Sequence, residues 1–537
     1  MEQYRKLRNN ILEYLEEITP QFPDKTAYAD NSSELTFAEV YEAAGSIGTV
    51  LANAGAKREP VAILMKKSPQ MVAAFYGCVY ASCMYVPLDD KMPDTRIKLI
   101  LETCGAKHII LDGSLFAKKK NKLAEIGFSG TVHVYEDMIQ TPADRNLLAE
   151  IRSRSIDTDP IYLVFTSGST GVPKGVAACH RSVIDYVENL SAVLKFDKDT
   201  VFGNQSPFYF DACLKELYPT MMFGCTTYII PKSLFMFPVK LIEFLNEKKI
   251  NTICWVASAL TLVSSVGTFD VVKPKYLRTV AFGSEVFPIK QFRKWREVLP
   301  GARFINLYGP TECTGMSCYY EVTRDFAEDE KIPIGRPFKN TDIMLLDAED
   351  RLVEKPFATA DHNSAPAGDS PATGNLETEG NVSETGEIVI RGTCVTLGYY
   401  NNPEKTKEAF VQNPLNPYYP ELVYRTGDIG RYNADGELVF VSRKDYQIKH
   451  MGHRIELGEI EAAVSTMEEI SMCACVYDTA ASMIVLYFTG NADSAGITLH
   501  LKQRVPSYML PGRIEVLTVM PLTENGKINR RQLKEML

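Results

Sequence analysis

The sequence of 537 residues lacks the features that mark secreted, zinc-stabilised or membrane-spanning proteins. Its 12 cysteines form no C-x-x-C pair, the nearest two being Cys473 and Cys475, so neither a zinc site nor a disulfide framework is predicted. No apolar run follows the charged start, as a secretory signal would require. The longest apolar stretch, 71–86, runs into Pro87 and is short for a membrane span. We therefore expect a cytoplasmic protein without a membrane span.

Positive charge is also in short supply. Lys and Arg number 58 against 67 Asp and Glu, which gives a formal charge of -9. This balance argues against a protein that binds nucleic acid or an anionic membrane. Hydrophobic residues make up 45% and charged residues 23%, the composition of a folded globular protein. The chain is too long for one ordinary core, so two or more domains are expected.

The stretch 162–176, YLVFTSGSTGVPKGV, predicts a buried strand that opens into a loop rich in glycine and hydroxyl residues. Glycines let backbone N–H groups approach a polyphosphate, hydroxyls donate further hydrogen bonds, and Lys174 adds a positive charge. The spacing differs from a Walker loop, because no Ser or Thr follows Lys174. A surface loop of Gly, Ser and Pro is the alternative interpretation. A helix is expected to begin near His180.

Strands and helices are predicted to alternate along the first 300 residues, which implies βαβ units and a largely parallel sheet. The predicted strands are 61–65, 85–89, 108–111, 226–230, 252–256 and 279–282, and the predicted helices include 69–81 and 93–103. The segment 355–384 has almost no large apolar residue, so we expect a mobile insertion between strands 342–346 and 386–391.

Further strings follow the phosphate loop in order: NLYGPTE at 306–312, YRTGD at 424–428, the run 442–461, and NGKINR at 525–530. Together they closely resemble the motifs of the adenylate-forming superfamily, which includes amino-acid adenylation domains, acyl-CoA synthetases and luciferases. The resemblance extends from Leu35 to Arg530. It implies a multi-domain α/β fold, with a large N-terminal domain of mixed and parallel sheets with helices (1–444) and a small α+β C-terminal domain (445–537). The hinge between the two would be Asp445.

The resemblance also implies a site for ATP and Mg²⁺. The ATP-binding positions would be Thr166, Ser167, Gly168, Ser169, Thr170, Gly171, Lys174, Gly283, Ser284, Glu285, Asn306, Tyr308, Gly309, Thr311, Asp428 and Arg443. Glu312 would hold the metal, since a hard cation that bridges ATP phosphates needs one carboxylate and few other protein ligands. Lys527 matches the catalytic lysine, assisted by Lys174 and Thr166. Asp428 is placed to accept hydrogen bonds from the ribose hydroxyls.

Asp211 distinguishes the branches of this superfamily. It follows three aromatic residues and is expected to be poorly solvated, which is costly for a carboxylate unless a cation is supplied. A helix N-cap is the structural alternative. In amino-acid adenylation domains the matching Asp binds the substrate's α-ammonium, a role that acyl-CoA synthetases do not need. The nearest branch is therefore the stand-alone amino-acid adenylation domain, which includes D-alanine:carrier-protein ligase.

Substrate specificity rests on a pocket that the resemblance assigns to Asp211, Ala212, Lys215, Trp255, Val280, Phe282, Leu307, Gly315 and Met316. Lys215 is its unusual member, and two directions are open for it. If Lys215 points inward it needs an anion, which the carboxylate of a substrate such as glutamate would supply. If it points outward, Trp255 and Phe282 leave a small pocket for alanine, serine or glycine.

The expected activity has two steps: formation of an aminoacyl-adenylate, and transfer to the phosphopantetheine thiol of a carrier protein. Lys449 and Gly452 belong to the loop that approaches this thiol. The sequence shows no carrier segment after Lys527, so we expect a separate carrier polypeptide. An acyl- or aryl-CoA synthetase is one alternative. A non-catalytic nucleotide-binding scaffold is another, and Glu312 with Lys527 argues against it.

Overall fold

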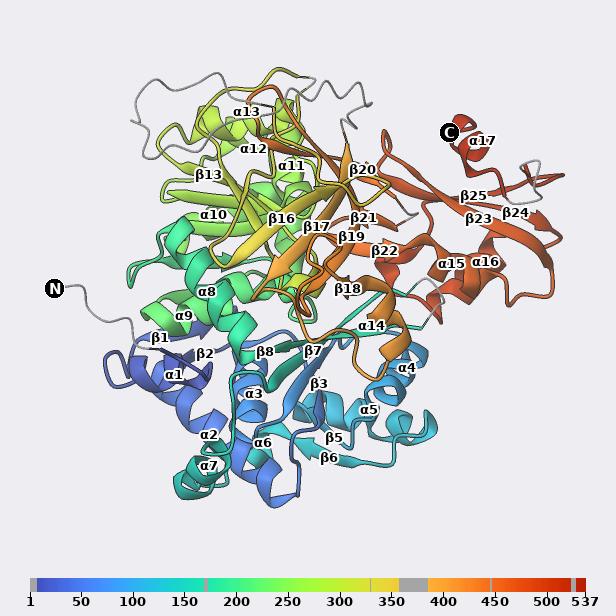
Figure 1. The fold of residues 1–537 in the computed structure, drawn as a ribbon. Helices are drawn as coiled ribbons and strands as arrows, with labels where there is room; N and C mark the ends of the chain where they lie inside the picture. The colour runs from blue at the N-terminus through green and yellow to red at the C-terminus, as the bar shows by residue number, and fades with distance from the viewer. Residues whose placement is uncertain (1–6, 169–171, 329, 357–384, 445–446, 523–527) are drawn as a thin grey trace.

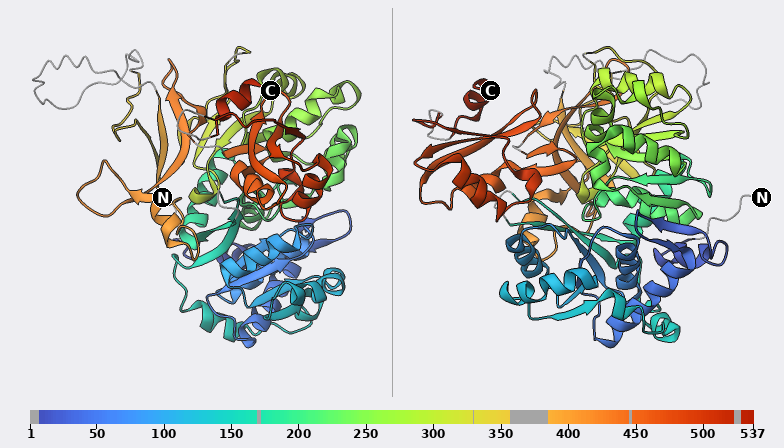
Figure 2. Two further views of the ribbon diagram at one scale, coloured as in Figure 1. Left: turned by 90° about the vertical axis from the view of Figure 1, so that its right-hand side faces the viewer. Right: turned by 180° about the vertical axis from the view of Figure 1, so that it is seen from behind.

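A computed structural model shows a large N-terminal domain and a smaller C-terminal α+β domain, which is red in Figure 1 and extends to one side there and in the right-hand view of Figure 2. This architecture confirms the predicted fold class. The described residues are 7–168, 172–328, 330–356, 385–444, 447–522 and 528–537. Nearly all of the predicted insertion, Asp445 and Lys527 lie outside them. No helix among the described residues is long and apolar enough to cross a membrane.

The first large sheet has six strands in the order β6-β5-β3-β4-β7-β8. Its strands are β3 (Pro60–Leu64), β4 (Met84–Leu88), β5 (His108–Leu111), β6 (Thr131–Val134), β7 (Pro160–Thr166) and β8 (Lys174–Cys179). All neighbours are parallel except β7 and β8, which form an antiparallel pair. The expectation of a parallel βαβ sheet is thus confirmed. Strand β8 was not predicted: the chain returns along β7 before helix α8 begins at His180.

The second large sheet has nine strands in the order β15-β14-β13-β12-β11-β9-β10-β1-β2. They are β1 (Thr26–Ala29), β2 (Glu34–Thr36), β9 (Val201–Asn204), β10 (Thr226–Ile229), β11 (Thr252–Val256), β12 (Thr279–Gly283), β13 (Arg303–Tyr308), β14 (Cys318–Glu321) and β15 (Arg336–Pro337). The run from β13 to β1 is parallel. The carboxyl ends of these parallel strands therefore meet at one edge, where ligands of open α/β sheets bind.

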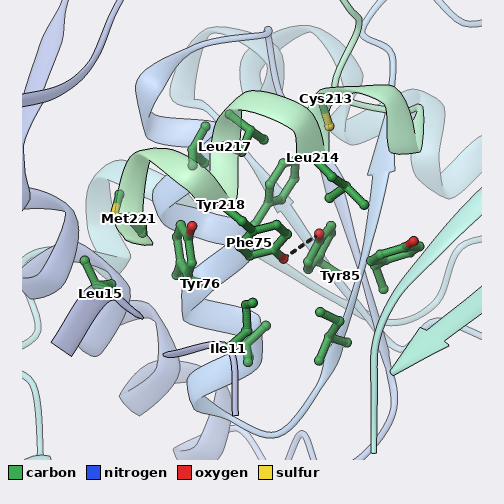
Figure 3. Packing of buried hydrophobic residues seen from close by; sticks show 14 of the residues in the cluster. Ile11, Leu15, Phe75, Tyr76, Tyr85, Cys213, Leu214, Leu217, Tyr218 and Met221 are labelled. Atoms are coloured by element: carbon green, nitrogen blue, oxygen red, sulfur yellow. Dashed lines mark hydrogen bonds between the residues drawn. The ribbon is translucent and has the colours of Figure 1, made fainter. Parts of the chain in front are cut away.

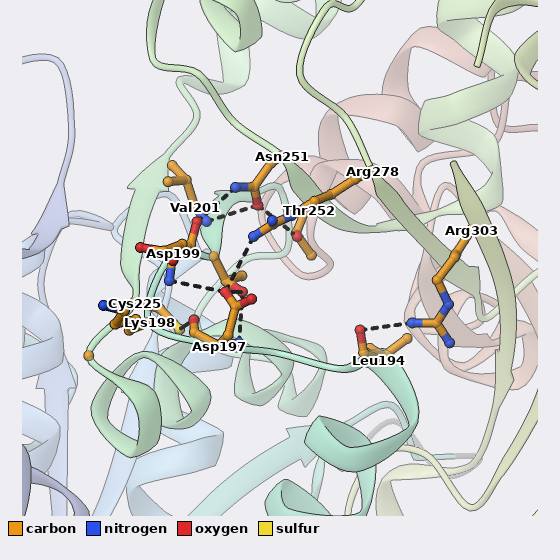
Figure 4. Close-up of polar contacts among 12 residues, drawn as sticks. Leu194, Asp197, Lys198, Asp199, Val201, Cys225, Asn251, Thr252, Arg278 and Arg303 are labelled. Atoms are coloured by element: carbon orange, nitrogen blue, oxygen red, sulfur yellow. Dashed lines mark hydrogen bonds and ion pairs between the residues drawn. The ribbon is translucent and has the colours of Figure 1, made fainter. Parts of the chain in front are cut away.

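The opposite edge, at the amino ends of the strands, is held by polar contacts (Figure 4). Arg278 donates to Asp197 at 3.3 Å, and Asn251 accepts the first backbone N–H of β9 at 3.0 Å. Arg303 donates to the carbonyl of Leu194, the last residue of α8, at 3.0 Å. These contacts satisfy backbone groups that would otherwise lack partners.

Helices cover the faces of both sheets. They are α1 (Leu12–Ile18), α2 (Phe37–Asn53), α3 (Pro69–Tyr80), α4 (Asp94–Cys104), α5 (Gly113–Glu125), α6 (Tyr135–Met138), α7 (Arg145–Arg152), α8 (His180–Leu194), α9 (Leu214–Phe223), α10 (Pro238–Glu247), α11 (Ala257–Ser265), α12 (Thr268–Val271), α13 (Ile289–Val298) and α14 (Pro403–Ala409). Sequence signals explain several starts. Thr36 and Glu39 form a capping box at α2, and Ser68 caps α3 ahead of Pro69.

Helix α9 is anchored in the largest hydrophobic core (Figure 3). Leu214, Leu217 and Tyr218 pack there with residues of α3 and β4, and the hydroxyls of Tyr218 and Tyr85 lie 2.9 Å apart. A single 3₁₀ turn, Asp211–Cys213, precedes the helix. The start of α9 is therefore a fixed platform for the side chains of Asp211 and Lys215.

The remaining strands form smaller sheets. An antiparallel sheet contains β16 (Thr341–Leu346), β17 (Gly386–Gly392), β18 (Phe410–Gln412), β19 (Leu422–Tyr432) and β20 (Leu438–Arg443). The C-terminal part contains the hairpin β21 (Gln447–His450) and β22 (His453–Glu456), the sheet of β23 (Ile470–Asp478), β24 (Met483–Gly490) and β25 (Arg513–Val516), and helices α15 (Leu457–Val464), α16 (Ser494–Lys502) and α17 (Arg530–Glu535).

A buried ion pair joins the two domains. Arg96 of α4 pairs with Glu459 of α15, and each side chain is only 4% exposed. Beside it, the Thr95 hydroxyl donates to the carbonyl of Gln503 at 2.7 Å. All 12 cysteines of the chain are buried and unpaired.

We predict that Arg96→Met loosens the docking of the C-terminal domain. The substitution leaves the Glu459 carboxylate buried without its cation, which typically costs about 3 to 5 kcal/mol. Hydrogen–deuterium exchange should become faster in α15 and in the β21–β22 hairpin. Lys98→Met is the matched control, because Lys98 lies on the same helix with a 47% exposed side chain. Unchanged exchange in α15 of Arg96→Met would contradict the prediction.

Candidate functional site

The predicted phosphate loop lies between β7 and β8. Thr166, the last residue of β7, is buried, and its hydroxyl has no hydrogen-bond partner among the described residues. Gly168 is required by close packing, since a Cβ there would lie 2.0 Å from the carbonyl oxygen of Val172. Ser169, Thr170 and Gly171 lie outside the described residues. Lys174 pairs with Thr166 in the hairpin register, so hydroxyl and ammonium flank the same loop.

Ser167 connects this loop to the C-terminal domain. Its hydroxyl donates to the carbonyl of Arg454 at 3.0 Å and accepts the backbone N–H of Glu456 at 3.1 Å. Strand β22 is thereby held against the loop that we expect to bind phosphates.

Glu312 forms the charged centre of the site. Its side chain is 0% exposed, and Arg454 of β22 pairs with it at 2.6 Å. The Tyr399 hydroxyl donates to the other carboxylate oxygen at 2.7 Å, and the Lys174 ammonium lies 5.0 Å from the centre of the Tyr399 ring. Burial alone would raise the pKa of Glu312, but Arg454 and Lys174 outweigh it and lower the pKa to about 2. The carboxylate is therefore ionised, and Arg454 neutralises it in this structure.

A second carboxylate, Asp428, lies in β19. It accepts a hydrogen bond from the Tyr308 hydroxyl at 2.6 Å and pairs with Arg443 at 2.6 Å. The Lys449 ammonium lies over the Tyr308 ring, 5.6 Å from its centre. Burial lowers the pKa of Lys449. The structure thus brings together the side chains predicted for adenine, ribose and the thiol-tunnel loop.

A cavity of about 880 Å³ opens at the carboxyl ends of β12 and β13. The predicted residues that line it are Ser284, Glu285, Asn306, Leu307, Tyr308, Arg443 and Lys449. Glu285 accepts the backbone N–H of Ser258 at 3.0 Å and that of Gly452 at 2.8 Å. Lys331 also lines the cavity and was missed, because it lies outside every motif.

Glycines allow the backbone to pass closely around this cavity. A Cβ at Gly283 would lie 2.2 Å from the carbonyl oxygen of Leu307, and one at Gly309 would lie 2.5 Å from that of Gly315. Thr311 and Glu312 follow in a 3₁₀ turn, Thr311–Cys313, directly after β13. The segment predicted to bind nucleotide is therefore tightly folded against its neighbours.

Asp211 is buried at the start of α9, with Ala212 beside it half-buried. Its Oδ2 has no hydrogen-bond partner in the described part of the chain, and it would lie 3.7 Å from a Cβ at Gly315. Burial raises the pKa of Asp211, and the nearby Lys215 only partly offsets this. An unpaired buried carboxylate of this kind is costly unless a cation joins it.

Three predicted pocket residues do not lie with Asp211. Trp255, Val280 and Phe282 belong to the hydrophobic core on the other face of the nine-stranded sheet. Successive side chains of a strand point to opposite faces, so their neighbours Cys254 and Ala281 face the core of Asp211 instead. The prediction was therefore wrong about which side chains of β11 and β12 face Asp211: it chose the alternate residues, which point to the opposite face of the sheet.

Leu307 and Met316 belong to the hydrophobic core on the Asp211 side of the sheet. The pocket wall opposite Asp211 is therefore made of smaller side chains than the sequence indicated. Trp255 is fully buried away from it and donates its indole N–H to the carbonyl of Gly203 at 2.8 Å.

The loop of the β21–β22 hairpin lines the cavity of about 880 Å³. Gly452 has φ of 79°, and a Cβ there would lie 2.6 Å from Val256. His453 stacks on Tyr508, with ring centres 3.7 Å apart, and meets Phe210 edge-on at 5.0 Å. Lys527, the predicted catalytic lysine, lies outside the described residues; the cation seen beside Glu312 is Arg454.

Comparisons with known proteins agree with this geometry. The sequence profile of the AMP-binding enzyme family matches residues 15–400. The chain is 30% identical over 543 residues to surfactin synthase subunit 1 of Bacillus subtilis (strain 168), covering 99% of this chain and 14% of that protein. It is 29% identical over 535 residues to tyrocidine synthase 1 of Brevibacillus parabrevis, covering 98% of this chain and 45% of that protein. The chain thus spans less than half the length of these relatives.

Solved structures share the fold. The adenylation domain AlmE of Vibrio cholerae, in complex with glycyl-adenosine-5'-phosphate, aligns with a TM-score of 0.78 at 19% identity and covers 100% of this chain and 99% of that one. The artificially fused adenylation-PCP di-domain NpsA-ThdA from Klebsiella oxytoca aligns with a TM-score of 0.76 at 20% identity, over 95% and 94% of the two chains.

We predict that Glu312 makes stability pH-dependent in acid. Because its pKa is lowered to about 2 in the folded chain, its contribution of about 3 kcal/mol is present above the ordinary value near 4.5 and is lost as the pH falls toward 2. The difference in unfolding free energy between the wild type and Glu312→Gln should therefore shrink from pH 6 to pH 3 in guanidinium titrations. A constant difference across this range would contradict the assignment.

Proposed function

The chain belongs to the AMP-binding enzyme family, and from that membership we propose that it activates an amino acid as an aminoacyl-adenylate and then passes the aminoacyl group to the phosphopantetheine thiol of a carrier protein. Asp211 is the observation that carries the amino-acid assignment. Its buried carboxylate has an oxygen without a partner among the described residues. The α-ammonium of an amino acid would supply the missing cation.

The residues present suit ATP and Mg²⁺. The cavity of about 880 Å³ adjoins Tyr308, whose hydroxyl bonds to Asp428, and the buried hydroxyl of Thr166 lacks a partner in the described part of the chain. Glu312 is an ionised carboxylate of the kind that Mg²⁺ prefers when substrate phosphates complete its shell. Bound Mg²⁺ would neutralise phosphate charge. Arg454 holds Glu312 in the conformation described, so it must leave before a metal can bind there.

In the first step the substrate carboxylate attacks the α-phosphorus of ATP, and pyrophosphate leaves. Negative charge grows on the phosphate oxygens, where Thr166 and Lys174 are placed to donate hydrogen bonds. By resemblance, Lys527 adds a positive charge at the same centre. Each such electrostatic group is typically worth about 3 to 4 kcal/mol in the transition state.

In the second step a thiol attacks the adenylate's carbonyl carbon, and AMP leaves. We assign the conformation described to this step, because the β21–β22 hairpin lies against the nucleotide cavity and Gly452 packs on Val256. For the first step, the small domain would swing about Asp445, withdraw Arg454 and bring Lys527 to the substrate. A carrier protein is the proposed thiol donor, and the buried, unpaired cysteines suit a reducing cytoplasm.

The function is tested by ATP–pyrophosphate exchange with a panel of amino acids, D-alanine, and fatty and aryl acids. We expect exchange only with amino acids. Lys527→Ala should reduce exchange about 100- to 1000-fold and leave ATP binding nearly unchanged, because the lysine acts on the transition state. Lys502→Ala, at an exposed position of α16, is the matched control.

Two outcomes would contradict these assignments. Exchange only with acids that lack an α-amine would favour a CoA synthetase. Wild-type activity in Lys527→Ala would remove the lysine from the mechanism.

A second prediction concerns the hinge. Asp445→Pro should slow thioester formation far more than pyrophosphate exchange, because a rigid hinge hinders the swing between the two steps. Asp445→Ala keeps the backbone free and should affect both assays little. Both rates are measured with a phosphopantetheinylated carrier protein. Equal loss in the two assays for Asp445→Pro would argue against domain alternation.

A further inference from the structure

Lys215 is a lysine buried beside Asp211. Its side chain lies in the first turn of α9 and the residue is only 3% exposed. It forms no ion pair and no hydrogen bond with any other residue that the structure describes. Buried lysines are rare unless they are paired, so this position calls for a nearby anion.

The position of Lys215 relative to Asp211 suits one ligand bound by both. Asp211 lies in the 3₁₀ turn that leads into α9, and Lys215 lies in the first turn of that helix. The charge of Lys215 acts on Asp211 and on Cys254 of β11, which places the lysine beside the proposed substrate site. The hydroxyl of Tyr186, which also senses Asp211, is buried without a partner among the described residues. Unsatisfied buried polar groups gathered at one place point to a ligand.

Glu216 follows Lys215 in the sequence and interacts with its charge, but it neutralises the lysine incompletely. One carboxylate oxygen accepts a hydrogen bond from Asn204 at 3.2 Å, whereas the other has no partner in the described part of the chain. Burial raises the pKa of Glu216 to about 7, so near neutral pH this group carries only part of a negative charge. It therefore leaves Lys215 short of an anion.

Lys67 adds a second positive charge to the same surroundings. Its ammonium donates to the carbonyl of Gln205 at 3.2 Å and lies 5.2 Å from the centre of the Phe208 ring. Its charge acts on Glu216. An α-ammonium bound at Asp211 would neutralise that carboxylate. Lys215 and Lys67 would then share the partly ionised Glu216 as their counter-ion. A second anionic group on the substrate would balance the remaining positive charge.

The side chains of β11 and β12 on the Asp211 side of the sheet are small. The argument for a small pocket rested on Trp255 and Phe282, which lie on the other face of the sheet. Cys254 and Ala281 take their places on the Asp211 side. These smaller side chains remove the steric reason to prefer alanine or glycine.

Resting on the function proposed above, we propose that Lys215 binds an anionic side chain and that the substrate is an α-amino acid with a side-chain carboxylate, such as glutamate or aspartate. The α-ammonium lies at Asp211, and the side-chain carboxylate lies at Lys215.

The test compares kcat/KM in ATP–pyrophosphate exchange for each acid and its amide, glutamate with glutamine and aspartate with asparagine. The members of each pair have nearly the same shape and differ in charge. We expect one acid to exceed its amide by about 10- to 100-fold, as a hydrogen bond to a charged group would give. Alanine, D-alanine, serine and glycine complete the panel.

Lys215→Met should abolish the preference for the acid, and Lys215→Arg should retain part of it. Thermal unfolding of each variant shows whether it is folded. If Lys215→Met does not fold, the ratio of kcat/KM for acid and amide in the wild-type protein still tests the preference for an acidic side chain. Preference for a small amino acid, or equal use of acid and amide, would overturn this inference and leave the proposed function standing. Exchange with no amino acid would overturn both.

Discussion

A carboxylate without solvent-exposed surface cannot stay ionised unless a cation accompanies it. Glu312 is such a carboxylate, and the arrangement of the two domains depends on the cation that pairs with it. Its cation in this structure comes from another domain, through Arg454 on β22. The charge at the centre of the large domain is thus coupled to the position of the small one. Any other cation that takes Glu312 must displace Arg454, and the hairpin contacts through Ser167 and Gly452 would be broken with it. One ion pair thereby links the chemistry of the site to the arrangement of the domains.

The sequence predicted the local structure well, because apolar runs and turn residues define strands and helices over short distances. Strand β11 spans the predicted 252–256, and helix α3 begins at the predicted Pro69. The cavity of about 880 Å³ also collects residues from separate motifs. What could not be predicted depends on contacts between distant segments. Arg96 and Glu459 are 363 positions apart, and nothing near either residue announces the other.

The error about which side chains of β11 and β12 face Asp211 has a physical cause. Both faces of the nine-stranded sheet are covered, so β11 and β12 are buried at every position and their sequences show no polar and apolar alternation. Without alternation, a shift of one residue exchanges one core for the other. Asp211 and Lys215 escaped this ambiguity, because charged residues at the start of a helix are visible in the sequence. Their positions are then fixed by the packing of α9, so the proposed recognition groups stand on a rigid element.

The reactivity of the Cys254 thiol matters because this residue lies on the Asp211 side of the sheet. An aminoacyl-adenylate is a strong electrophile, and a nearby thiolate would capture it before any external acceptor could. Burial raises the pKa of Cys254 well above its usual value, so the thiol stays protonated and is a poor nucleophile. The other cysteines are buried as well. The protein would in this way protect itself from self-acylation while it holds a reactive intermediate.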